Sequence, residues 1–494
     1  MDSDLVAIQD VRERCRTAAQ AAIDLQRFTQ AELNAIVEAM ARAAYEAAEQ
    51  LAEMAVEDTR LGNVHDKTLK NVFASWTVYQ YIKDLRTTGV IRERSEEKIL
   101  EIAEPVGVIA AILPTTNPTS TAINKALIAL KSGNSIIMSP HPRAARCVQA
   151  AVDILLNAAV KAGAPDDCIS TLAHPTLAAT QALMTHREVK LILATGGPAM
   201  VRAAYSAGKP AYGVGPGNVP VFLEKSAKTC KAIRDILVSK TFDYGTLCTS
   251  EQSLIVEDCH KERVVRELIQ QQAYFTTPEE SDRLAQLLVK PDGSINPAVV
   301  GQSPRRLAEM ASITVPAETV AFVTPQKGVG KAHPLSIEKL SPVLAFYVEP
   351  DPDACIRRAV AVANFGGKGH SAIIHSKDEE IIRHFAQALP TYRILVNTPG
   401  DHGGVGMTTG LTPSMSLGSG TISGCITTDH VSPLHLINIK RVAYELNALD
   451  DAPLKQPGES FDAVPGANVR TPGRRYNGYK KWDDPPIQVG PRRE

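Results

Sequence analysis

Residues 105–140 read PVGVIAAILPTTNPTSTAINKALIALKSGNSIIMSP and contain the alternation that decides the fold. The apolar run 106–113 predicts a buried strand, residues 119–131 a helix and residues 135–138 a second strand. The pattern continues with a helix over 143–162 and a strand over 189–194. Strands separated by helices of this length predict a parallel sheet, which binds ligands at the carboxyl ends of its strands.

A second α/β domain is predicted further along the chain, where the alternation resumes after residue 250. Its strands are expected over 253–256, 343–348, 371–375 and 394–397. Upstream, residues 4–60 have apolar residues at helical spacing. After Leu449, Pro, Gly and Arg dominate and preclude a long helix, which predicts a docked arm or a free tail.

The composition excludes several function classes. The chain has 494 residues, 44% hydrophobic and 22% charged, which is typical of a globular protein with two or three domains. Its net charge of −1 argues against nucleic acid or an anionic membrane as partner. No apolar run is long enough for a membrane helix and no signal peptide is evident, so a cytoplasmic location is expected.

The eight cysteines and twelve histidines show no metal-binding or disulfide pattern. The cysteines are scattered without a C-x-x-C pair, and no H-E-x-x-H or comparable spacing is present. We therefore expect reduced thiols and no bound metal.

Seven short blocks carry a resemblance to a known family. They are EPVG (104–107), PTTNPTS (114–120), SPHPR (139–143), ATGGP (194–198), KTFDYGTLC (240–248), EKLSP (338–342) and HLINIK (435–440). With these blocks in this order, the chain resembles the CoA-acylating branch of the aldehyde dehydrogenases. It is most similar to the aldehyde half of bifunctional aldehyde-alcohol dehydrogenases and to the aldehyde dehydrogenases of ethanolamine and propanediol utilisation.

The resemblance implies an aldehyde dehydrogenase-like α/β fold with two parallel-sheet domains, a small oligomerisation element and a C-terminal arm. The expected parts are a dinucleotide-binding domain (1–215) with an oligomerisation hairpin near 95–105, a catalytic domain (216–430), a return segment (431–449) and the arm (450–494). The N-terminal helical region is interpreted as the first layer of the dinucleotide domain. The alternative is an encapsulation helix, which some bacterial relatives carry there.

Two residues are assigned to catalysis by the resemblance. Cys248 matches the family nucleophile, whose thiolate adds to the aldehyde carbonyl. Asn117 matches the side-chain donor that stabilises the resulting oxyanion. Without the resemblance, a lone cysteine is more typical of a core, and an asparagine before a proline is more typical of a turn or helix cap.

The cofactor-binding residues follow from the same blocks. Thr195, Gly196 and Gly197 follow a strand and open a helix, so their backbone amides could face a pyrophosphate. Glu338 matches the carboxylate that binds the nicotinamide ribose. The remaining expected contacts are Thr115, Thr116, Ser139, His141, Gly215 and Leu340. NAD is the expected cofactor, and NADP stays open because no acidic residue is evident near Ser139.

Coenzyme A is the expected acyl acceptor. Gly213 occupies the position at which hydrolytic relatives carry a water-activating glutamate, which argues against the rival assignment, a hydrolytic aldehyde dehydrogenase. His370 could assist proton movement, although a structural histidine is the more frequent case.

The aldehyde is left open by the sequence. His402, Thr408 and Thr409 lie where relatives line the substrate entrance, so a polar aldehyde such as sulfoacetaldehyde or succinic semialdehyde is the alternative to an acetaldehyde-like substrate. A non-catalytic scaffold or filament subunit is a further alternative, against which the retained Cys248 argues.

The expected reaction is reversible conversion of a short aldehyde, NAD and CoA into acyl-CoA and NADH. The resemblance also implies a homo-oligomer, a dimer or larger. A bacterial microcompartment is a second candidate location, with a shell or enzyme partner engaged through a terminus.

Overall fold

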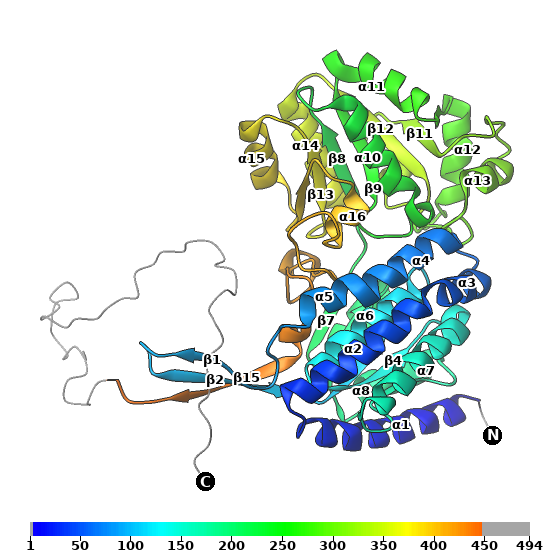
Figure 1. Cartoon of the computed structure of the whole chain (residues 1–494). Coiled ribbons are helices and arrows are strands. Elements are labelled where there is room, and N and C mark those ends of the chain that lie inside the picture. Colours follow the sequence, from blue (N-terminus) through cyan, green and yellow to red (C-terminus); the bar gives the residue numbers. More distant parts are fainter. Residues whose placement is uncertain (1–2, 447–494) are drawn as a thin grey trace, which may run out of the picture. The chain divides into compact units, whose positions relative to one another are not determined.

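The computed structural model describes residues 3–446 (Figure 1). Contacts group residues 3–92 and 101–441 in one unit and residues 93–100 and 442–446 in a second, small unit. The predicted arm at 450–494 lies outside the described residues. Among residues 3–446, no helix is both long and apolar enough to cross a membrane.

Five parallel strands form the N-terminal sheet, in the order β5-β4-β3-β6-β7. Their bounds are β3 Val108–Ile112, β4 Ser135–Ser139, β5 Ile169–Thr171, β6 Val189–Thr195 and β7 Ala211–Val214. Because neighbouring residues of a strand point to opposite faces, the apolar run of β3 fills two cores. Val108 and Ala110 belong to one core, and Ile109 and Ala111 to the other.

Helices cover both faces of this sheet (Figure 1). On the face of Val108 lie α1 Ser3–Leu25, α8 Leu177–Thr185 and α9 Pro198–Tyr205. On the face of Ile109 lie α2 Gln30–Glu46, α3 Ala48–Thr59, α5 Val78–Ile82, α6 Pro118–Lys131 and α7 Ala145–Lys161. Helix α4 Val64–Val72 follows α3 and continues through a short π-helical turn, Phe73–Thr77. The N-terminal helices thus form layers of this domain, as the sequence predicts.

Seven parallel strands form the second sheet, in the order β10-β11-β12-β9-β8-β13-β14. Their bounds are β8 Val219–Leu223, β9 Glu251–Glu257, β10 Ala273–Phe275, β11 Ala321–Pro325, β12 Val343–Glu349, β13 Ala372–His375 and β14 Ile394–Val396. Helices α10 Thr229–Thr241 and α11 Asp258–Gln270 pack on one face. Helices α14 Pro352–Gly366 and α15 Glu379–Ala388 pack on the other. The remaining helices are α12 Pro278–Leu288, α13 Pro304–Ala311 and α16 Gly400–Gly404.

A three-stranded sheet contains the predicted hairpin. Its strands β1 Gly89–Arg94, β2 Ile99–Pro105 and β15 Ile437–Ala443 pair in the order β1-β2-β15. The predicted architecture of two parallel α/β sheets is confirmed. The first sheet ends at Val214 and the second begins at Val219. The domain bounds and the oligomerisation role of the hairpin stay predictions.

Candidate active site

A cavity of about 600 Å³ lies at the carboxyl ends of β3, β4 and β6. Segments around the second sheet close it from the other side, through Thr246, Cys248, Glu338 and Leu340. This is the edge at which parallel sheets bind ligands. The structure places all the predicted catalytic and cofactor-binding residues in its wall: Thr115, Thr116, Asn117, Ser139, His141, Thr195, Gly196, Gly197, Gly215, Cys248, Glu338 and Leu340.

The turn between β6 and α9 gives the cavity exposed backbone amides. Gly197 is the N-cap residue of α9, and Pro198 follows at the first helical position. A Cβ atom at Gly197 would meet nothing within 4 Å, so the space before the helix is open. The Thr195 hydroxyl is buried without a partner among the described residues. An open helix start and a free hydroxyl fit a phosphate group.

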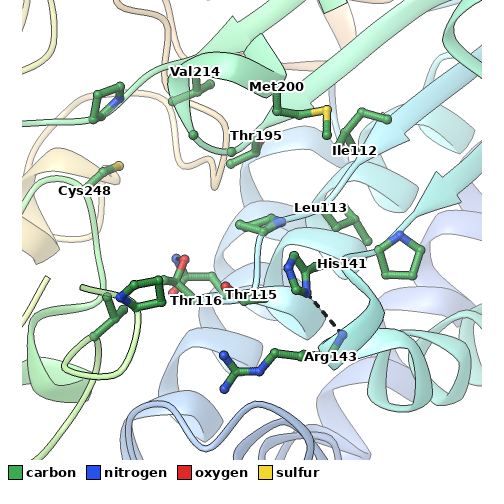
Figure 2. A pocket seen from close by; sticks show the side chains of 18 of the residues that line it. Ile112, Leu113, Thr115, Thr116, His141, Arg143, Thr195, Met200, Val214 and Cys248 are labelled. Atoms are coloured by element: carbon green, nitrogen blue, oxygen red, sulfur yellow. Dashed lines mark hydrogen bonds between the residues drawn. The ribbon is translucent and has the colours of Figure 1, made fainter. Parts of the chain in front are cut away.

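The opposite wall carries a cationic group. The backbone N–H of Arg143 donates to His141 Nδ1 at 3.2 Å, and the Arg143 guanidinium donates to the carbonyl of Thr59. Figure 2 shows His141 and Arg143 separated from Cys248 by the width of the pocket. Among the described residues that line the cavity, the only carboxylate is that of Glu338.

Cys248 lies between a short 3₁₀ turn, Phe242–Gly245, and β9. Its side chain is partly exposed and faces the cavity. Burial raises the pKa of Cys248 to about 12, the Glu338 carboxylate adds to the rise, and Arg393 opposes it. The thiol is therefore protonated at neutral pH in this state. Nucleophilic attack requires a group that accepts its proton.

Glu338 is fixed beside Cys248. Its Oε1 accepts a hydrogen bond from the N–H of Gly217 at 3.1 Å. A Cβ atom at Gly217 would lie 2.1 Å from the carbonyl oxygen of Cys248, so only glycine permits this approach. Burial raises the pKa of Glu338 to about 7, although the hydrogen bond from Gly217 has the opposite effect and lowers it.

Asn117 occupies the N-cap position of α6, but its side chain does not cap the helix. Its Oδ1 instead accepts a hydrogen bond from Lys70 Nζ at 2.7 Å, and its Nδ2 donates to Thr116 Oγ1 at 3.1 Å. An amide nitrogen carries two hydrogens, so one N–H stays available at the cavity wall. Asn117 therefore lies at the N-cap position of α6, while its side chain makes no capping hydrogen bond.

Lys67, Lys70 and Asp243 form a buried charge cluster that the sequence analysis missed. Lys67 Nζ and Lys70 Nζ lie 2.8 and 2.6 Å from Asp243 Oδ2. Burial raises the pKa of Asp243, but the two ammonium groups outweigh this effect and lower it. The two lysines are three residues apart on one helix, and this spacing was the feature of the sequence that could have indicated the cluster. It does not by itself distinguish buried lysines from exposed ones.

His370 is buried beside the cavity rather than in its wall. Its Nδ1 lies 3.1 Å from Ser371 Oγ, while Nε2 has no partner among the described residues. Burial, Arg393 and His430 lower its pKa to about 3. The ring is therefore a neutral base, and it shares the surroundings of Gly217 with the Cys248 carbonyl.

The predicted polar entrance residues are mostly engaged with the protein itself. Thr408 Oγ1 lies 2.6 Å from Thr398 Oγ1, and Thr409 Oγ1 donates to the carbonyl of Gly403 at 2.8 Å. The His402 ring packs on Phe242 with ring centroids 4.9 Å apart, and burial lowers its pKa. Neither threonine lies in the wall of a described cavity.

A small second cavity lies next to Leu247, the neighbour of Cys248. It holds about 10 Å³ and is lined by Lys70, Phe73, Phe242, Leu247, Asp401, His402, Val405, Met407 and Met415. Space of this size holds roughly one water molecule. The lining is mainly apolar.

The structure corrects one expectation about Gly213, which does not lie in the cavity wall. A Cβ atom there would lie 2.7 Å from Val201 Cγ1 and 2.8 Å from Tyr205 Cε2, so a longer side chain would meet α9. Gly215 lines the cavity, and a Cβ atom at Gly215 would meet nothing within 4 Å. An introduced carboxylate therefore fits at Gly215 and not at Gly213.

No group of His, Cys, Asp or Glu side chains within residues 3–446 is arranged to hold a metal ion.

Comparison with known proteins shows the family of the chain. The model of the aldehyde dehydrogenase family matches residues 5–287, and the chain belongs to this family. Among curated relatives, it is 42% identical over 421 residues to the bifunctional aldehyde-alcohol dehydrogenase AdhE of Escherichia coli strain K12. That match covers 84% of this chain and 47% of the relative, so the chain spans about half the length of the relative.

Two solved structures place the chain near acylating members of the family. An acetylating aldehyde dehydrogenase from Geobacillus thermoglucosidasius is 50% identical with a TM-score of 0.90, covering 91% of this chain and 99% of that one. A propionaldehyde dehydrogenase from Rhodopseudomonas palustris, with bound CoA and an acylated cysteine, is 27% identical with a TM-score of 0.80. The second match covers 88% of this chain and 97% of the neighbour.

Proposed function

We propose that this chain is a CoA-acylating aldehyde dehydrogenase that converts a short aldehyde, NAD and CoA into acyl-CoA and NADH. The observation that carries the proposal is one cavity that combines Cys248, the free N–H of Asn117 and an open helix start. The similarity to acetylating relatives supports CoA as the acyl acceptor.

The chain's own residues account for the acylation step. The Cys248 sulfur bonds to the aldehyde carbon as its proton passes to solvent, and the carbonyl oxygen takes up negative charge. The free N–H of Asn117 stabilises this oxyanion. NAD supplies the acceptor for the hydride that leaves the former aldehyde carbon. A thioester on Cys248 results.

Transfer to CoA completes the cycle. The CoA thiol attacks the thioester, the carbonyl re-forms, and Cys248 leaves as a thiolate that takes back a proton. The Nε2 atom of His370 has no partner among the described residues, which supports a role for this ring in accepting the thiol proton. Burial lowers the pKa of His370 to about 3, which weakens the ring as a base.

The proposed substrate is acetaldehyde or another aldehyde with a short apolar chain. The small cavity beside Leu247 has room for about one methyl-sized group and an apolar lining. Lys70, the cation in that lining, is already paired with Asp243. An anionic substituent would therefore lack a free counter-charge there. We expect kcat/KM to fall from acetaldehyde to butanal and to be lowest for succinic semialdehyde, and the reverse order would favour the polar alternative.

NAD is the proposed cofactor, and the preference for NAD over NADP can be tested directly. The proposal of NAD rests on the family resemblance alone. The cavity wall around Ser139 and His141 contains Arg143 and, among the described residues, no carboxylate that would repel the 2′-phosphate of NADP. Comparison of kcat/KM for NAD and NADP, in the unmodified protein and in Arg143→Gln, tests the assignment. A strong preference for NADP that Arg143→Gln abolishes would overturn it.

One assay separates the three candidate functions. NADH and acetyl-CoA formation from acetaldehyde, followed with and without CoA, should show sustained turnover only with CoA. Acetate as the main product would indicate the hydrolytic rival, and no NADH under either condition would indicate a scaffold. Self-association and microcompartment association stay predictions from the resemblance, and a cytoplasmic location stays a prediction from the sequence composition.

A further inference from the structure

We propose that Lys70 is a positioning residue that fixes the amide of Asn117 so that its N–H faces the cavity. The inference rests on the proposed function, because it concerns the oxyanion site of that reaction. Lys70 acts through Asn117 and does not line the large cavity itself.

The first step of the argument concerns the direction of the amide. Asn117 has two fixed polar contacts, Lys70 Nζ at 2.7 Å from Oδ1 and Thr116 Oγ1 at 3.1 Å from Nδ2. A hydroxyl can donate or accept, so Thr116 is compatible with either orientation of the amide. An ammonium group can only donate. Lys70 therefore decides which end of the amide faces it, and a reversed amide would place two donors together.

The second step concerns the ammonium group, which has no freedom to turn away. Besides Asn117, Lys70 Nζ donates to Asp243 Oδ2 at 2.6 Å and to Thr246 Oγ1 at 2.9 Å. Its three hydrogens thus have three partners. The Lys70 side chain is 3% exposed, so water does not compete for these bonds.

The third step concerns the anchor, Asp243, whose carboxylate is held from both sides. Oδ1 accepts from the N–H of Asn63 at 2.8 Å, while Oδ2 binds both lysines. The backbone of Asp243 has φ +47°, a conformation that non-glycine residues rarely adopt. Gly62 is required beside it, since a Cβ atom there would lie 1.7 Å from Asp243 Oδ1. A strained residue held this firmly is typical of functional sites.

The cluster also has an electrostatic consequence. Burial lowers the pKa of Lys70, but the Asp243 carboxylate opposes this effect. The Lys70 ammonium group lies 2.7 Å from Asn117 Oδ1, which places a positive charge next to the amide. That charge favours an oxyanion nearby in a site of low dielectric. The same residues therefore orient the donor and stabilise the charge that the donor receives.

A double-mutant cycle tests the proposal, with the single-turnover rate of NADH formation at saturating acetaldehyde as the readout. Asn117→Ala should lower this rate by roughly 10²–10³-fold, the usual effect of removing one oxyanion donor. Lys70→Met should lower it by at least about tenfold, within that range, with little change in the KM for acetaldehyde. In the Asn117→Ala background, Lys70→Met should have almost no further effect, because it acts through the missing amide.

Lys67→Met is the matched control. Lys67 pairs with the same carboxylate, but its second bond goes to the carbonyl of Thr116 rather than to the Asn117 side chain. It should lower the melting temperature as much as Lys70→Met does, with a much smaller loss of rate. If Lys70→Met does not fold, Lys70→Gln replaces it in the same cycle.

Two results would overturn the proposal. In the first, the Lys70 substitution lowers the single-turnover rate by the same factor in the Asn117→Ala background as in the unmodified protein. The other is an unchanged single-turnover rate in the folded Lys70 variant. These results differ from the one expected if the proposed function is wrong, because the unmodified protein would then form no acetaldehyde-dependent NADH at all.

Discussion

Each side chain that we propose for catalysis depends on a neighbour that controls its protonation or its direction. Cys248 is a protonated thiol until a base takes its proton, because burial and Glu338 raise its pKa. The hydrogen bond from Lys70 sets the direction of the Asn117 side-chain amide. Glycine at 217 leaves space where a side chain would meet the Cys248 carbonyl, and a side chain at 215 would point into open space. The chemistry at the residue scale thus depends as much on what surrounds Cys248 as on the thiol itself.

Cys248→Ala should abolish NADH formation while leaving NAD binding intact. An alkyl side chain cannot form the covalent adduct from which hydride leaves. Stopped-flow absorbance at 340 nm and NAD titration by fluorescence measure the two properties. Cys230→Ala is the control, because Cys230 is an exposed thiol. Near-normal turnover in Cys248→Ala would show that the nucleophile is another group.

Gly215→Glu should raise acetate formation without CoA by about tenfold or more. A positioned general base typically contributes about 10²–10⁴-fold, and this position opens into the cavity. Gly213→Glu is the matched control: its side chain meets α9, so it should lower stability without forming acetate. Acetate is quantified after incubation with acetaldehyde and NAD. No increase in a folded Gly215→Glu that still forms NADH would refute the idea that a missing base limits hydrolysis.

At the scale of elements, the site depends on the buried carboxyl ends of β3 and β6. Lys125 of α6 donates to the carbonyls of Ile112 and Leu193 at 2.8 and 2.9 Å, which ties the helix behind Asn117 to these strands. Burial lowers the pKa of Lys125 to about 7. The neutral amine therefore predominates in the folded protein above this pH.

This burial predicts that stability rises with pH between about 7 and 8. The unfolded chain, with an ordinary lysine, binds more protons over this range than the folded chain, so raising the pH favours folding. Lys125 contributes at most about 1.4 kcal/mol per pH unit to the slope. Lys125→Met should flatten the plot of unfolding free energy against pH, measured in urea, whereas the exposed control Lys290→Met should not. An unchanged slope in Lys125→Met would contradict the assignment.

The elements themselves were largely predictable, and the side-chain directions were not. Apolar runs flanked by Pro and Gly predicted strands such as β3 and β4, with ends within one or two residues of the observed ones. Such runs are recognisable because a strand that is buried on both faces must be apolar along its whole length. The position of Gly213 followed from resemblance, but neighbouring strand residues point to opposite faces. Only the structure shows that its missing side chain points to α9 and not to the cavity.

At the scale of the whole chain, the site joins segments far apart in sequence. Lys70, Asn117, Cys248 and Glu338 are brought together, although no local pattern links them. Motif resemblance could locate three of them, because each lies in a recognisable block. Lys70 lies in none of these blocks, so its role required coordinates. Contacts between distant segments are the part of a site that single-sequence reasoning recovers least.

The most direct test of the central claim is a pre-steady-state measurement of NADH formation from acetaldehyde without CoA. In the part of the chain that the structure describes, the cavity wall has no carboxylate besides Glu338, which is bound to Gly217, so water attack on the Cys248 thioester should be slow. We predict a burst of about one NADH per active site, a slow phase after it, and sustained turnover to acetyl-CoA when CoA is added. Rapid steady-state production of acetate and NADH without CoA would contradict the acylating assignment.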